Sequence, residues 1–155
     1  MYADALTCDH IRIMVNRALA AFDMMESGNN LVPGAFFTRS ALRYKIGTAD
    51  GDYVSESTFW DMKVSKNLFL TSEHTLQLAI YHLLGKLSSN DHKNMTIKQN
   101  GEDLYQNYRS VKKIGVINPR QNVIWVIDLD DVGHDVIETI ARDVVGMTED
   151  LVSIV

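Results

Sequence analysis

Three aspartates follow a strongly apolar segment late in the sequence. Asp128, Asp130 and Asp131 come directly after residues 123–127, all of which are apolar. Residues two apart on a strand face the same side, so the carboxylates of Asp128 and Asp130 could share a cation. Mg²⁺ prefers oxygen ligands of this kind and often bridges them to a substrate phosphate. Asp128, Asp130 and Asp131 are therefore a candidate magnesium site.

The same segment resembles the first motif of the haloacid dehalogenase-like phosphohydrolases, an apolar strand followed by Asp-x-Asp. The resemblance implies phosphoryl transfer with Asp128 as the nucleophile and Asp130 as the acid/base. The family places this motif near the start of a long parallel α/β domain, whereas here it lies near the end of 155 residues. A structural role is the alternative: aspartates commonly cap helices, and Asp130 or Asp131 would cap the helix expected next.

Aromatic and basic side chains occur together between residues 105 and 120. Tyrosine rings can stack on bases, while lysine and arginine can hold phosphates, so this set is a candidate nucleic-acid site. Its members are Tyr105, Tyr108, Arg109, Lys112, Lys113 and Arg120. A solvated strand edge, on which lysines deter aggregation, would carry the same residues.

Charge is distributed unevenly along the chain. Residues 86–122 carry seven Lys/Arg and three Asp/Glu. Residues 123–155 carry one Lys/Arg and eight Asp/Glu. The formal net charge of the whole chain is −5, while dedicated nucleic-acid-binding domains are usually basic. Pairing of the basic and acidic segments, within one chain or across a dimer, is therefore the competing explanation.

The other nucleophilic and titratable residues form no complete catalytic pattern. None of the five histidines has a zinc-ligand spacing. Cys8 is the only cysteine, and His10, two positions away on a helix, would point elsewhere. The sequence has no G-x-S-x-G elbow and no glycine-rich phosphate loop. We expect no catalytic residues and no cofactor, with magnesium as the alternative.

Apolar residues spaced three and four apart predict three helices, over residues 7–27, 72–87 and 131–145. Residues 53–70 have no clean period, and residues 31–70 receive no assignment. A β-hairpin is predicted over residues 111–117 and 123–129, because Asn118-Pro119 favours a turn.

The all-apolar character of residues 123–127 predicts a strand covered on both faces, and hence at the centre of its sheet. The expected fold is α+β, with a small, mostly antiparallel sheet, this hairpin strand at its centre and about three helices. We expect one globular domain over residues 1–155.

The end of the sequence is apolar and would be costly to leave in water. It could add a strand to its own sheet or to a neighbouring subunit. The expected oligomer contacts are Leu151, Val152, Ile154 and Val155.

Composition points to a protein of the reducing cytoplasm that does not enter membranes. It has a single cysteine and no apolar run approaching ~18 residues. We expect a non-catalytic binding or regulatory protein that acts through protein–protein contacts and self-associates, such as a phage-type accessory or inhibitor protein. The alternatives are binding of RNA or single-stranded DNA, and Mg²⁺-dependent phosphoryl transfer at Asp128 and Asp130.

Overall fold

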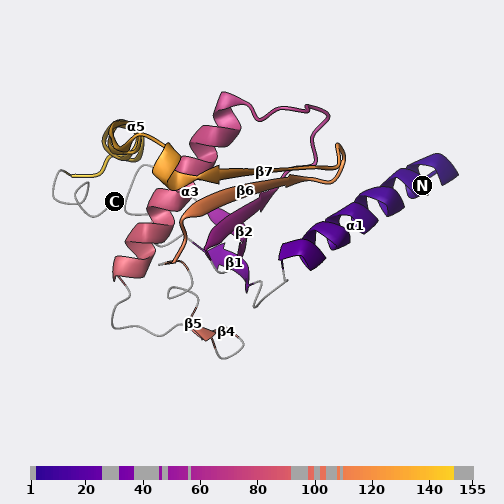
Figure 1. Ribbon diagram of the computed structural model, residues 1–155, viewed down its shortest axis with the longest axis horizontal. Coiled ribbons are helices and arrows are strands. Elements are labelled where there is room, and N and C mark those ends of the chain that lie inside the picture. The colour runs from indigo at the N-terminus through magenta and orange to yellow at the C-terminus, as the bar shows by residue number, and fades with distance from the viewer. Residues whose placement is uncertain are drawn as a thin grey trace.

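A five-stranded mixed sheet forms the centre of the computed structural model (Figure 1). The structure describes residues 3–25, 32–36, 46, 49–55, 57–91, 98–99, 102–103, 108 and 110–148. In spatial order the strands are β1 (Val32–Phe36), β2 (Asp50–Ser55), β3 (Thr58–Met62), β6 (Lys113–Asn118) and β7 (Val123–Asp128). Only the β3–β6 pair is parallel among these neighbours. A separate short ladder joins β4 (Lys98–Gln99) to β5 (Glu102–Asp103).

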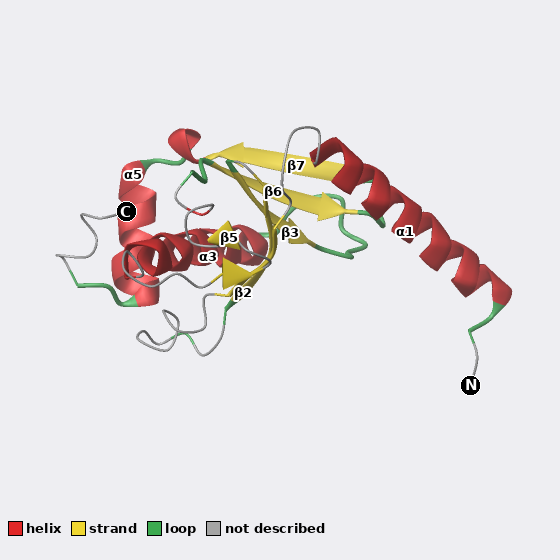
Figure 2. Ribbon diagram, turned by 90° about the horizontal axis from the view of Figure 1, so that it is seen from below, coloured by secondary structure: helices red, strands yellow, loops and turns green. Residues whose placement is uncertain are grey.

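Helices pack on both faces of the sheet (Figure 2). The long helices are α1 (Ala5–Met25) and α3 (Ser72–Asp91). The chain continues from β7 through the 3-10 turn η1 (Leu129–Asp131), the short helix α5 (His134–Thr139) and the π-helix η2 (Ile140–Val145). The predicted α+β class and mostly antiparallel sheet are confirmed. No helix among the described residues is long and apolar enough to span a membrane.

Local capping explains where the helices begin and end. The carboxylate of Asp4 accepts a hydrogen bond from the Thr7 amide at 2.7 Å, so α1 starts earlier than predicted. The hydroxyl of Thr71 likewise accepts from the His74 amide at 3.3 Å and caps α3. Gly146 ends η2 with a φ of 81°, a left-handed conformation that glycine adopts without strain.

Successive residues of β3 point into two different apolar clusters. Phe59 is fully buried beneath α3, where it belongs to a cluster with Leu83 and Leu84. Trp60, on the opposite face, packs in a second cluster with Ala21 of α1 and Ile117 of β6. The sheet is therefore covered by α3 on one face and by the C-terminal half of α1 on the other.

The predicted central position of residues 123–127 is wrong. β7 lies at the edge of the sheet, and its residues alternate between half-buried and exposed. Trp125 packs against the core beneath α3, whereas Ile124 and Val126 are exposed on the other face. β3 and β6 lie inside the sheet, next to each other. They are parallel, and the chain passes from one to the other through a crossover that contains α3. The predicted hairpin itself is confirmed by the β6–β7 register.

Candidate functional site

The outer edge of β7 combines apolar side chains with open backbone groups. Ile124 and Val126 are 39% and 52% exposed. The amide of Leu129 donates to the carbonyl of Lys112 at 2.9 Å. Hydrogen-bonded pairs recur at every second residue of an antiparallel ladder, so Ile127 and Trp125 also bond to β6. The backbone N–H and C=O groups of the alternate residues, Ile124 and Val126, therefore point away from β6. No described strand pairs with that side of β7.

Opposite charges mark the two ends of β7. The exposed Arg120 lies in the turn before the strand, and the exposed Asp130 and Asp131 lie in η1 after it. At the acidic end, the carboxylate of Asp128 is 4.0 Å from the Lys113 ammonium. The edge is therefore basic at its start and acidic at its end.

Helix α1 presents apolar side chains well beyond the stripe that packs on the sheet. The guanidinium of Arg17 donates to the carbonyls of Pro119 and Arg120 at 3.2 and 3.1 Å, which fixes the middle of the helix at the β6–β7 turn. The preceding turns project away from the sheet (Figure 1). Exposed apolar side chains on α1 are Leu6, Ile11, Ile13, Val15, Leu19 and Met24. Helices with so broad an apolar surface are usually covered by another element.

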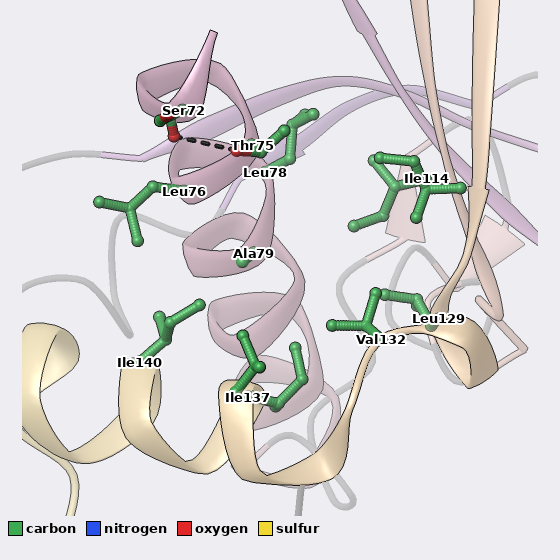
Figure 3. Close-up of a pocket in the computed structure, with 12 residues that line it drawn as sticks. Ser72, Thr75, Leu76, Leu78, Ala79, Ile114, Leu129, Val132, Ile137 and Ile140 are labelled. Atoms are coloured by element: carbon green, nitrogen blue, oxygen red, sulfur yellow. Dashed lines mark hydrogen bonds between the residues drawn. The ribbon is translucent and has the colours of Figure 1, made fainter. Parts of the chain in front are cut away.

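An apolar groove of about 310 Å³ lies on the α3 side of the sheet. Figure 3 shows the side chains that line it: Leu76 and Ala79 from α3, Ile114 from β6, Ile137 from α5 and Ile140 from η2. The hydroxyl of Thr75 is bonded within α3 to the Ser72 carbonyl at 3.0 Å. The groove is therefore suited to apolar groups and offers little directed hydrogen bonding.

A more polar cavity of about 550 Å³ lies beside this groove and shares three apolar wall residues with it. Its polar lining comes from His82, Lys86, Lys112, Asp130 and His134. Burial, aided by the nearby Lys86 ammonium, lowers the pKa of His82 to about 4, so this ring is neutral at pH 7. The imidazole of the exposed His134 lies 3.4 Å from the Glu138 carboxylate.

The described members of the predicted nucleic-acid site do not form one surface. Tyr108 is 2% exposed, with its ring 6.1 Å from that of Phe59, and burial raises the pKa of its hydroxyl. A ring buried in this way cannot stack on a base, so the predicted role of Tyr108 is wrong. The ring instead packs against apolar side chains beneath α3. Lys112 and Lys113 are exposed, but Arg120 lies at the other end of β6. Tyr105 and Arg109 lie outside the described residues.

The predicted magnesium residues have a different local geometry from the one expected. The strand ends at Asp128, so Asp130 lies in η1 and does not share a strand face with it. The Asp128 carboxylate accepts from the Asp130 amide at 3.2 Å and caps η1. Asp131 is exposed. Among the described residues, no three acidic, histidine or cysteine side chains converge as metal ligands.

Two features of the candidate surfaces escaped the sequence reasoning. His82 and Lys86 are one helical turn apart and line the same cavity. Their spacing can be read from the sequence, but it indicates a site only once the fold places Lys112 at the same cavity. The breadth of the apolar surface on α1 was also missed. The expected oligomer contacts, Leu151, Val152, Ile154 and Val155, lie outside the described residues.

Known proteins give no further guide to the site. Comparisons with family models, with curated proteins and with solved structures find no match to this chain. Contacts, burial and charge of the described residues are therefore the basis for assigning a function.

Proposed function

We propose that this protein is a non-catalytic binding protein that acts through protein–protein contacts, and that it pairs with a second copy of itself along β7. The supporting observation is the exposure of Ile124 and Val126 on an edge strand whose outward backbone groups have no described partner strand. An apolar edge strand of this kind is a template for pairing with another chain. Pairing would satisfy the backbone groups and would cover part of the apolar surface of the two side chains with their cross-strand neighbours.

Charge favours an antiparallel pair. In that arrangement Arg120 of one copy lies beside Asp130 and Asp131 of the other, and the reciprocal contact follows from the two-fold symmetry. A parallel pair would instead place the acidic ends together. Antiparallel pairing also limits this contact to two copies, because it occupies the outer edge of β7 in both of them.

Side-chain register supports the same arrangement. With Trp125 on the two-fold axis, Ile124 of each copy lies opposite Val126 of the other. Both residues direct their amides outward, as a hydrogen-bonded antiparallel pair requires. Cross-strand pairs of β-branched side chains each add roughly 0.2–1 kcal/mol. The two apolar pairs would thus form one continuous stripe across the interface.

We place this activity in the cytoplasm, in keeping with the single cysteine. A regulatory role, as in an accessory or inhibitor protein, fits a chain whose exposed apolar surfaces include both β7 and α1. The dimer would leave the projecting half of α1 available to another protein.

Sedimentation and light scattering on the full chain test the proposal. We expect a concentration-dependent dimer that Ile124→Lys combined with Val126→Lys converts to a monomer with unchanged circular dichroism. Val64→Lys is the matched control, because Val64 is 58% exposed in the loop after β3. A strictly monomeric wild-type chain, or a dimer insensitive to the β7 substitutions, would contradict self-pairing.

Charge reversal tests the orientation. Arg120→Glu should weaken the dimer, and adding Asp130→Arg and Asp131→Arg to the same chain should restore it, because each reversed contact then regains its opposite charge. Failure of this rescue, with a dimer that still depends on Ile124 and Val126, would overturn the antiparallel arrangement.

A further inference from the structure

The polar cavity beside the apolar groove carries more positive than negative charge. Lys86 from α3 and Lys112 from the segment before β6 line it, with Asp130 as the one lining carboxylate among the described residues. Neither lysine forms an ion pair with the described part of the chain. Two ammonium groups around one cavity attract an anion and can hydrogen-bond to it.

A buried histidine adds a second, independent indication of a ligand. His82 is 5% exposed and lines the same cavity. Its Nδ1 atom is buried and has no hydrogen-bond partner among the described residues. Leaving such an atom unsatisfied costs roughly 1–3 kcal/mol, so native proteins usually supply it with a partner. In the neutral ring, the Nδ1–H tautomer can donate a hydrogen bond to a carboxylate or phosphate oxygen.

The remaining walls of the cavity are apolar. Val111, Leu129, Val132 and Ile137 line it beside the polar groups. The volume of about 550 Å³ is within the range of small-molecule sites. A ligand that fits this lining has an anionic group at one end and an apolar body.

We infer that this cavity binds a small organic anion, with its carboxylate or phosphate held by Lys86, Lys112 and His82. Its apolar part lies against Val132 and Ile137, which also wall the apolar groove. The three groups that hold the anion lie on the α3 side of the sheet, whereas the proposed pairing uses the edge of β7 and the opposite face. Asp130 alone belongs to both surfaces, and it is not one of the groups that hold the anion. Failure of either proposal therefore leaves the other intact.

Histidine-selective NMR on the full chain provides the test, with hexanoate, hexyl phosphate and hexanol as probes. At least one of the two anions should shift the ring ¹⁵N signals of His82 saturably, while hexanol, which lacks the charge, should have little effect. Comparing hexanoate with hexyl phosphate identifies the preferred anionic group. High salt should weaken binding by screening the lysines.

Substitutions locate the binding groups. Lys86→Gln and Lys112→Gln should each raise the dissociation constant about tenfold, the loss expected for one charge-assisted contact. Lys66→Gln is the matched control, because Lys66 is exposed and outside the cavity lining. Lys112 is itself exposed, so its variant should fold even if the Lys86 variant does not. Equal response to hexanol and to the anions, or wild-type affinity in the folded lysine variants, would overturn the inference.

Discussion

Gly115 lies directly against the indole ring of Trp60 on the face of the sheet that α1 covers. A Cβ atom at position 115 would be 2.1 Å from Cε3 of Trp60. The two residues are register partners in the parallel β3–β6 pair. The indole Nε1 donates to the Ser55 hydroxyl at 2.7 Å, which fixes the ring in this position. Because glycine has no Cβ, the ring can lie across β6 and pack against Ala21 of α1.

The first prediction is that Gly115→Ala destabilises the protein by about 1–3 kcal/mol, because a well-packed ring must move to admit the methyl group. Urea denaturation should show a lower midpoint with an unchanged slope. Gly133→Ala is the control: its Cβ would meet the end of the flexible Asp135 side chain, 2.5 Å away. That variant should lose less than about 1 kcal/mol, the cost of alanine in place of glycine at the N-cap of α5. Equal losses in both variants would refute the packing explanation.

Local sequence patterns were sufficient for α3 and for the hairpin. The helix predicted over residues 131–145 is divided, because Asp131 ends η1 and α5 begins only at His134. The apolar spacing in residues 72–87 lies within α3, and the last helical segment ends at Val145, as predicted. In each case the signal and the structure it specifies lie in one short stretch of chain. The first helix was found by the same signal, with its start misplaced because the cap is Asp4.

The order of the strands could not be predicted in the same way. An all-apolar strand such as residues 123–127 can be covered on both faces or left at an edge, and its own residues do not distinguish the two. The position of β7 depends on the β3–α3–β6 crossover, which inserts β6 between β3 and β7. The cavity at His82 depends equally on contacts distant in sequence, since Lys112 and His134 reach it from other elements.

The second prediction concerns Asn118, a buried side chain that joins two loops. Its amide donates to the carbonyls of Ser65 and Asn67 at 3.0 and 3.3 Å, and its Oδ1 accepts from the Arg120 amide at 3.2 Å. Asn118→Ala should lower the free energy of unfolding by roughly 2–3 kcal/mol, because several buried groups lose their partners. Denaturant titration measures this loss.

Gln121→Ala provides the comparison for Asn118. Its side chain donates to the Lys66 carbonyl at 2.6 Å in an exposed position, where water can replace the bond. The loss should be about 0.5 kcal/mol or less. A cost at Gln121 as large as that at Asn118 would rule out burial as the reason for the difference.

The third prediction is that the first turns of α1 exchange their amide hydrogens faster than the middle of α3. Leu83 and Leu84 are fully buried, whereas Leu6 and Ile11 are 65% and 48% exposed. Segments with few tertiary contacts open locally, well below the free energy of global unfolding. Asp4→Ala should accelerate exchange at Thr7 and Cys8 further, with little change in the urea midpoint. Hydrogen exchange followed by NMR measures both effects, and protection of α1 equal to that of α3 would contradict them.

The fourth prediction is a loss of stability between neutral and acidic pH, caused by His82. Burial lowers its pKa from 6.5 to about 4 in the folded protein. Over the interval between these values the unfolded chain binds a proton that the folded chain excludes, so the free energy of unfolding falls as the pH falls. The complete contribution is on the order of 3 kcal/mol.

A variant without the histidine isolates this contribution. Burial raises the pKa of Asp61, which acts in the opposite direction over part of the same range. Asp61 is present in both proteins, so its effect cancels when wild type is compared with His82→Gln. The wild-type free energy of unfolding, measured by urea titration from pH 7 to pH 4, should fall more steeply than that of the variant. Parallel pH profiles would show that His82 is not excluded from protonation in the folded state.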